Sequence, residues 1–200
     1  MFPVLLQIGP FIISTLGIFT AIGFIGGSFL VWRTLRDYAV SDEKIFDNIL
    51  VIASLSLIGA RIGAVIINWP IFSVNLLRIL VIWKFPGLSV WGAFMGGLLG
   101  FLIYGKKQKL SLGQLFDSYG VALPFLILCF SLGVFFDGSL VGLETNLPWG
   151  LPAVAMEGRR HPVALYASIV SFMILIFVTI FRQKLLTKKL PQGVIGSIFL

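Results

Sequence analysis

The residues best suited to chemistry lie in one polar stretch, residues 137–166, between two long apolar segments. Arg159 and Arg160 precede His161, the only histidine of the chain, and Pro162 follows it. Proline suits the first position of a helix, and the free N–H groups at a helix start attract anions. Histidine is also the side chain best suited to proton transfer near neutral pH. The stretch predicts an anion site beside a proton-transfer group, with ordinary interfacial charge as the favoured reading of Arg159.

A further cation, Arg61, lies inside an apolar segment at residues 49–69. A guanidinium within a membrane span costs roughly 2.5–3.5 kcal/mol on insertion scales, so such groups usually face a cavity or a partner. Arg61 lies about 12 residues into its segment, which at ~1.5 Å per residue places it beyond mid-membrane toward the outer side. We expect it to bind a lipid phosphate. The alternatives are a structural pair with an acid, for example Asp137, or a side chain that extends to the outer surface.

Two other reactive side chains have less specific surroundings. Cys129 lies in the middle of an apolar segment and is expected to be a small core residue rather than a nucleophile. Tyr166 lies one turn after Pro162, where it could cap a cavity, although packing explains it as well. One cysteine and one histidine exclude an internal disulfide and argue against a metal site rich in these ligands, so we expect no metal and no cofactor.

The composition is that of an integral membrane protein. Of the 200 residues, 58% are hydrophobic and 12% are charged, whereas soluble domains have roughly 45–50% and about 25%. The net charge of +7 fits lysines and arginines held in cytoplasmic loops better than a nucleic-acid partner, and we expect none. Residues 1–32 carry no charge, so no cleavable signal peptide is predicted and the first apolar segment is expected to be retained.

Apolar segments close to the ~20 residues of a membrane-spanning helix recur along the chain. They occupy residues 11–32, 49–69, 88–104, 120–136 and 162–181, and a further apolar run begins at Val194. We therefore predict an all-α integral membrane protein, a helix bundle of five full spans plus the start of a sixth. Residues 1–200 are expected to form a single transmembrane domain.

Charge predicts the orientation of these spans. The first, third and fifth loops carry ten Lys and Arg residues, and the second and fourth carry four. Positive loops stay in the cytoplasm, so the N-terminus and the loop at residues 137–161 are expected outside. Four tryptophans near the predicted boundaries are typical of an aromatic belt. They are Trp69, Trp83, Trp91 and Trp149.

Glycines spaced four residues apart occur in two of the segments, at Gly59 and Gly63 and at Gly92 and Gly96. Small residues with this spacing let helix backbones approach closely. The pattern fits a tight bundle around a cavity, and it fits intramolecular packing without a cavity equally well.

Taken in order, several motifs resemble the bacterial prolipoprotein diacylglyceryl transferase family. They are Ile8-Gly9-Pro10, Gly59-Ala60-Arg61-Ile62-Gly63, the glycine-rich run at residues 96–100, T-N-L-P-W-G at residues 145–150, and R-H-P-x-x-L-Y at residues 160–166. The resemblance covers nearly the whole chain. It implies a multi-pass enzyme of the bacterial plasma (inner) membrane with seven helices and its N-terminus outside. It also implies that this chain stops before the seventh helix.

The resemblance implies an activity and its partners. The family moves a diacylglyceryl group from phosphatidylglycerol to the lipobox cysteine thiol of a prolipoprotein signal peptide, in lipoprotein biosynthesis within membrane lipid. The thiol attacks a glycerol carbon, and glycerol phosphate leaves. By this resemblance His161 is the catalytic residue that assists the thiol, while Arg61 and Arg160 bind the lipid phosphate. Residues expected to line the cavity are Trp91, Gly133, Asp137, Gly142 and Tyr166.

The chain departs from the family pattern at several positions. The family's H-G-G reads Trp91-Gly92-Ala93, its G-R-x-G-N keeps only Gly133, and its N-G-E reads Asp137-Gly138-Ser139. We therefore expect a transferase, with a catalytically lapsed relative that binds lipid or a partner as the alternative. A small transporter is disfavoured because inverted repeats and broken helix pairs are not apparent.

Overall fold

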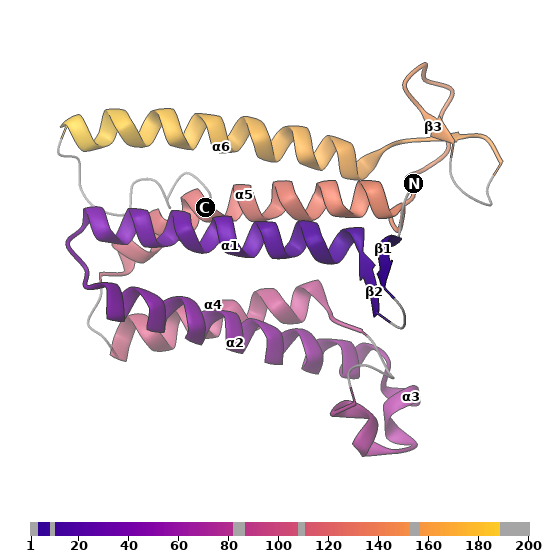
Figure 1. The fold of residues 1–200 in the computed structure, drawn as a ribbon, viewed down its shortest axis with the longest axis horizontal. Helices are drawn as coiled ribbons and strands as arrows, with labels where there is room; N and C mark the ends of the chain where they lie inside the picture. The colour runs from indigo at the N-terminus through magenta and orange to yellow at the C-terminus, as the bar shows by residue number, and fades with distance from the viewer. Residues whose placement is uncertain (1–3, 9–10, 82–86, 108–110, 153–156, 189–200) are drawn as a thin grey trace. The chain divides into compact units, whose positions relative to one another are not determined.

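In the computed structural model, the described residues are 4–8, 11–81, 87–107, 111–152 and 157–188 (Figure 1). Two compact units make up the chain. One unit holds Met1–Thr34 and Phe116–Leu200, and the other holds Leu35–Leu115. The polar stretch with Arg160 and His161 belongs to the first unit, whereas Arg61 belongs to the second.

Four helices in the described part of the chain are long and apolar enough to cross a membrane. They are α1 (Thr15–Asp37), α2 (Asp42–Ile67), α5 (Leu112–Asp137) and α6 (Val163–Lys188). The prediction of a mostly helical membrane protein is therefore confirmed. A further helix, α4 (Val90–Lys107), has 18 residues and ends in two lysines. The apolar run from Val194 lies outside the described residues.

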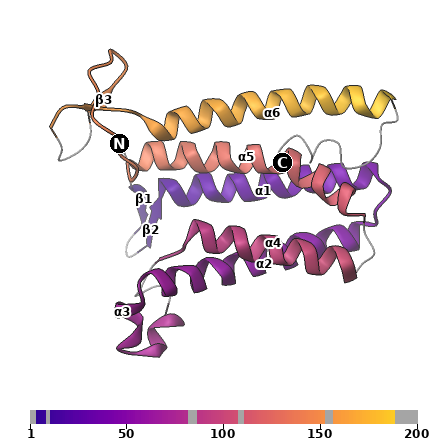
Figure 2. The same cartoon turned by 180° about the vertical axis from the view of Figure 1, so that it is seen from behind.

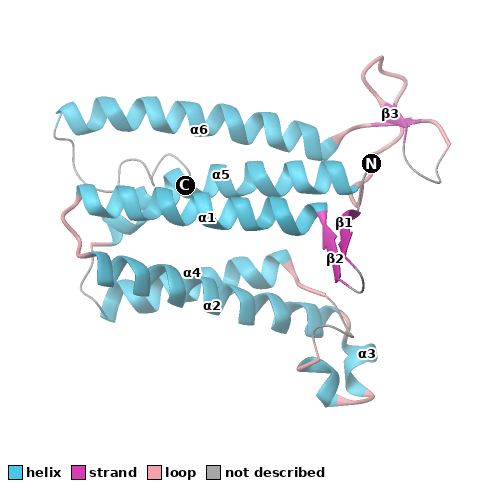
Figure 3. Ribbon diagram, in the orientation of Figure 1, coloured by secondary structure: helices cyan, strands magenta, loops and turns pink. Residues whose placement is uncertain are grey.

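The start of the first predicted span is wrong. Residues 11–14 form a strand, β2 (Phe11–Ser14), which pairs antiparallel with β1 (Val4–Ile8) (Figure 3). The helix begins at Thr15 because Ser14 caps it, accepting a hydrogen bond at Oγ from the Gly17 N–H at 3.0 Å. The β-branched pair before Ser14 favours a strand over a helix.

In the first unit, α1, α5 and α6 lie side by side in both views (Figures 1 and 2). Their common core contains Val121 and Val178, packed against Leu30 and Ile174. Glycines of α1 let α5 approach closely: a Cβ atom on Gly23 would lie 3.0 Å from the Cβ of Cys129. Because Cys129 is 6% exposed, the prediction that it is a core residue is confirmed.

In the second unit, α2 and α4 pack as an antiparallel pair. The Tyr104 hydroxyl near the end of α4 donates to the Lys44 carbonyl near the start of α2 at 2.8 Å. After α2 the chain forms α3 (Trp69–Ser73) and a 3₁₀ helix, η1 (Leu76–Ile79), before it returns to α4.

Candidate functional site

The polar stretch begins where α5 ends. Gly138 has φ 77°, a left-handed conformation that favours glycine, and its N–H donates to the Val134 carbonyl at 2.9 Å. The chain then leaves the helix direction and forms a loop. This loop carries three of the predicted site residues, Gly142, Arg160 and His161.

Main-chain pairing holds the loop together. The strand β4 (Arg159–Arg160) pairs with β3 (Leu151–Pro152), and Arg160 also forms an antiparallel bridge with Glu144. On the Glu144 side, the His161 N–H donates to the Leu143 carbonyl at 3.0 Å. Arg160 therefore lies on a central strand, fixed from both edges, directly before α6.

The T-N-L-P-W-G segment forms a tight turn in this loop. The Leu147 N–H donates to the Thr145 hydroxyl at 3.2 Å, and the Gly150 N–H donates to the Leu147 carbonyl at 3.0 Å. Pro148 occupies the second turn position, where its fixed φ is favourable. The turn therefore sets the direction of Trp149, at its third position.

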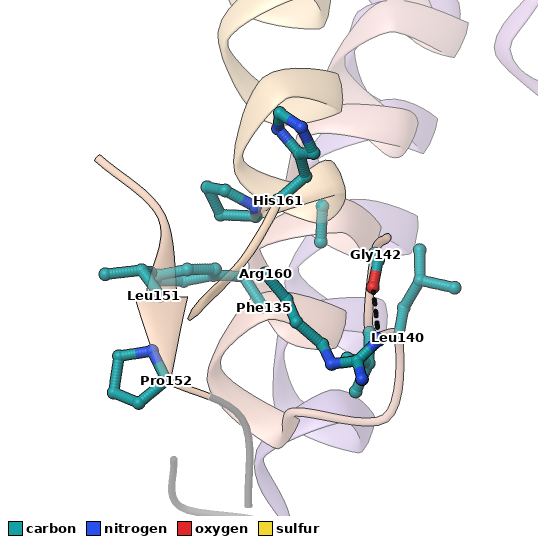
Figure 4. A pocket seen from close by; sticks show the side chains of 10 residues that line it. Phe135, Leu140, Gly142, Leu151, Pro152, Arg160 and His161 are labelled. Carbon is teal, nitrogen blue, oxygen red and sulfur yellow. Dashed lines mark hydrogen bonds between the residues drawn. The ribbon is translucent and has the colours of Figure 1, made fainter. Parts of the chain in front are cut away.

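A small cavity lies between this loop and the adjoining helix ends (Figure 4). Its volume is about 20 Å³, enough for roughly one water molecule or one oxygen of a larger ligand. Its walls include Phe135, Gly142, Leu151, Arg160 and His161. A Cβ atom on Gly142 would lie 3.0 Å from the His161 Cβ, so a larger residue at this position would displace His161.

Arg160 has an unused hydrogen-bond donor at this cavity. Its Nη1 donates to the Gly142 carbonyl at 3.5 Å, drawn as the dashed line in Figure 4. Its Nε is buried and has no hydrogen-bond partner among the described residues. A buried donor left unpaired costs about 1–3 kcal/mol, which a ligand oxygen would relieve. The neighbouring Arg159 is exposed and its Nη1 donates to the Pro148 carbonyl at 3.2 Å.

His161 belongs to a chain of three polar side chains. Its Nδ1 lies 3.2 Å from the Tyr166 hydroxyl oxygen, and the Trp149 Nε1–H donates to the same oxygen at 2.9 Å. The His161 and Tyr166 rings meet edge to face, with centroids 6.1 Å apart. Figure 4 shows the Arg160 and His161 side chains diverging from the backbone, since successive residues of an extended chain point to opposite sides.

The other residues predicted to line a cavity have varied positions. Asp137 is the last residue of α5 and is partly exposed. Gly133 faces α1, where a Cβ atom would lie 2.9 Å from the Cβ of Phe19. Trp91 belongs to the other unit and is 79% exposed. In the part of the chain that the structure describes, no group of three or more His, Cys, Asp and Glu residues could hold a metal ion.

Arg61 is 7% exposed and bonded to main-chain carbonyls of its own unit. Its Nε and Nη2 donate to the Ile79 and Arg78 carbonyls, each at 2.9 Å, and its Nη1 donates to the Gly87 carbonyl at 3.2 Å. The guanidinium also lies 5.0 Å from the centre of the Phe72 ring. These contacts tie the segment after α2 to the helix itself.

Comparison with known proteins decides the family. A sequence model described as prolipoprotein diacylglyceryl transferase matches residues 3–200. The chain belongs to the prolipoprotein diacylglyceryl transferase family.

Individual family members agree. The chain is 29% identical to a phosphatidylglycerol–prolipoprotein diacylglyceryl transferase of Clostridioides difficile (strain 630), over 84% of this chain and 66% of that protein. It is 30% identical to the protein of the same name from Trichormus variabilis (strain ATCC 29413 / PCC 7937), over 99% of this chain and 72% of that one. The chain thus spans between about two thirds and three quarters of the length of these relatives.

Sequence reasoning missed one contact in this diacylglyceryl transferase family member. Trp149 is expected in the aromatic belt, and the structure adds that its indole N–H donates to the Tyr166 hydroxyl oxygen at 2.9 Å. The T-N-L-P-W-G sequence could have pointed to this contact, because it predicts a tight turn and a fixed turn gives its third residue a fixed direction. Two of the motifs that carry the resemblance, T-N-L-P-W-G and R-H-P-x-x-L-Y, are therefore joined by a hydrogen bond.

Proposed function

We propose that this chain transfers the diacylglyceryl group of phosphatidylglycerol to the cysteine thiol of a prolipoprotein lipobox. The observation that carries the proposal is the family match over residues 3–200, together with relatives that bear the name of this activity. In the reaction, the thiol sulfur forms a bond to a glycerol carbon while the bond from that carbon to the phosphate oxygen breaks. Glycerol phosphate leaves with the electron pair.

Arg160 is the proposed phosphate contact on the loop. Its buried Nε lacks a partner among the described residues, and the adjoining cavity has room for one oxygen. A guanidinium placed at a departing phosphate stabilises the charge that develops there. Arg61 is the proposed second contact to the lipid phosphate. His161 is the proposed group that receives the thiol proton. Asp137, Gly142 and Tyr166 are the proposed lining of this site, which is supported for Gly142 by its place in the cavity wall and for Tyr166 by its contact with His161.

The proposed location is the bacterial inner membrane, with several spans and the N-terminus outside. The greater number of lysines and arginines in the odd-numbered loops supports this orientation. The loop between α5 and α6 would then face outward, on the side where an exported prolipoprotein presents its lipobox.

A direct assay tests the activity. The purified full chain, mixed with phosphatidylglycerol vesicles and a lipobox peptide, should release glycerol phosphate and increase the peptide mass by one diacylglyceryl group. A peptide with serine in place of the cysteine, and vesicles of phosphatidylcholine alone, should give neither product. His161→Ala should abolish release. If the full chain releases nothing under conditions where a relative is active, the transferase proposal fails.

The alternative is a relative that binds the lipid without reaction. The departures from the family pattern, including Trp91 at a family histidine position, favour this alternative. It predicts that the chain in detergent micelles binds added phosphatidylglycerol, that Arg160→Gln weakens this binding, and that no glycerol phosphate appears.

A further inference from the structure

The contacts of the Tyr166 hydroxyl bear on which nitrogen of His161 carries a proton. The Tyr166 hydroxyl oxygen lies between two nitrogens, Trp149 Nε1 at 2.9 Å and His161 Nδ1 at 3.2 Å. An indole N–H can only donate, whereas an imidazole nitrogen either donates or accepts according to the tautomer. The assignment therefore starts from the tryptophan.

Because Trp149 donates, the Tyr166 oxygen acts as acceptor on that side and keeps its own proton for another partner. His161 Nδ1 is the other hydrogen-bond partner of the hydroxyl among the described residues. If the hydroxyl proton is used in this contact, Nδ1 is the acceptor, and a neutral imidazole with Nδ1 unprotonated carries its proton on Nε2.

We propose that Trp149 and Tyr166 are positioning residues that fix neutral His161 as the Nε2–H tautomer. The Trp149 indole orients the Tyr166 hydroxyl, and the hydroxyl donates its proton to Nδ1. The T-N-L-P-W-G turn thus acts on the R-H-P-x-x-L-Y motif through one oxygen atom. Neither motif alone contains the full arrangement.

The assignment restricts the chemistry of His161, a step that rests on the proposed function. The basic nitrogen of this tautomer is Nδ1, and the Tyr166 hydroxyl covers it. A thiol proton would reach Nδ1 in a relay: Tyr166 passes its own proton to Nδ1 and takes the thiol proton in its place. Two protons move, the products are a thiolate and an imidazolium, and no other reactant is needed.

Because His161 is the only histidine, labelling with ¹⁵N-histidine gives a spectrum of this ring alone. We would record the ring nitrogens of the full chain in detergent micelles, at a pH where titration shows the ring to be neutral. The expected spectrum has a protonated Nε2 and an unprotonated Nδ1. A protonated Nδ1 in the unaltered chain would overturn the proposal.

Variants test each positioning residue. Tyr166→Phe and Trp149→Phe keep an aromatic ring but remove the O–H and N–H, and both should convert the single tautomer into a mixture. Tyr104→Phe removes the same hydroxyl where α4 contacts α2 and should leave the spectrum unchanged. If the first two variants also leave it unchanged, neither residue positions His161.

Activity gives a separate readout. We expect Tyr166→Phe to lower glycerol phosphate release by about 100-fold or more, as for loss of a proton-transfer group. Trp149→Phe should lower it by about 2- to 10-fold, as for loss of one hydrogen bond. An active Tyr166→Phe enzyme would overturn the relay. An inactive unaltered chain with the expected tautomer would overturn only the proposed function.

Discussion

Gly92 on α4 lies so close to Gly59 on α2 that a Cβ atom on Gly92 would overlap the Gly59 carbonyl oxygen. The close approach continues one turn further along α2, because a Cβ atom on Gly63 would lie 3.0 Å from the Cα of Gly92. Backbone atoms cannot rotate away as side chains can. The two G-x-x-x-G patterns therefore face one another and set the distance between the helices.

Gly92→Ala should destabilise the protein by about 1–3 kcal/mol, the usual cost of an overpacked contact. The matched control is Gly97→Ala on the same helix, where the nearest atom is the Ser56 hydroxyl, which can rotate away. Thermal unfolding in detergent micelles should show the larger loss for Gly92→Ala. Equal losses for both variants would contradict the backbone contact.

The neighbouring arginines of β4 provide a test of the phosphate contact. Arg160→Gln should lower glycerol phosphate release by about 100- to 1,000-fold, as for loss of one transition-state donor. Arg159→Gln should lower it far less, because Arg159 is exposed and bonded to the Pro148 carbonyl. The assay is the release of glycerol phosphate from phosphatidylglycerol vesicles. Similar losses for both variants would contradict a specific phosphate contact at Arg160 and would indicate that only the positive charge of the loop is required.

Arg61→Gln should loosen the segment that follows α2. The variant loses charged donors to the carbonyls of Arg78, Ile79 and Gly87, and bonds to charged groups contribute about 1.5–3 kcal/mol each. Hydrogen exchange followed by mass spectrometry should become faster in peptides covering η1, with little change in α6. Unchanged exchange in η1 would contradict a role in holding this segment.

A single turn offers a stabilising substitution. Ala39, in the turn after α1, has φ 57°, a conformation that costs about 1–2 kcal/mol for a residue with a Cβ atom. Ala39→Gly should therefore raise stability by about 0.5–1 kcal/mol after the greater entropy loss of glycine is counted. Ala53→Gly, inside α2, should have the opposite sign. Chemical unfolding of the two variants in micelles measures both effects, and a loss of stability in Ala39→Gly would refute the assignment.

The orientation can be tested by labelling because the natural cysteine is buried. Cys129 is 6% exposed, so a cysteine introduced at an exposed position dominates the reaction with a maleimide that cannot cross membranes. Glu144→Cys should react in intact cells, whereas Lys106→Cys should react only after the cells are opened. The reverse pattern would invert the proposed topology.

The helices were predictable because long apolar stretches leave few alternatives in a membrane. The boundaries of the helices were less predictable. The strand before Thr15 depends on pairing with β1, which no local pattern of the first apolar stretch shows. The glycine spacing predicted close helix packing without indicating which helices meet, and the contacts at Gly59 and Gly92 assign that packing to α2 and α4.

The sequence indicated candidate site residues but not the bonds between them. The sequence places Arg160 and His161 next to each other, yet only the strand geometry sends their side chains in different directions. The bond from Trp149 to Tyr166 joins residues 17 positions apart through a turn, and spacing along the chain does not reveal it. Arg61 was expected to bind a lipid phosphate, to pair with an acid or to extend to the outer surface. Its bonds to main-chain carbonyls depend on how the chain folds back after α2, which the sequence pattern does not show.

Arg61 binds peptide oxygens of Arg78, Ile79 and Gly87, and every amino acid supplies such an oxygen. Substitutions at Arg78 and Ile79 can accumulate among relatives without removing the acceptors, provided that the chain keeps its path, whereas Gly87, with φ 154°, favours glycine for its own backbone. Methods that infer proximity from correlated substitutions therefore do not detect such a bond. Insertions and deletions, which shift the path itself, are the changes that this arginine does not tolerate.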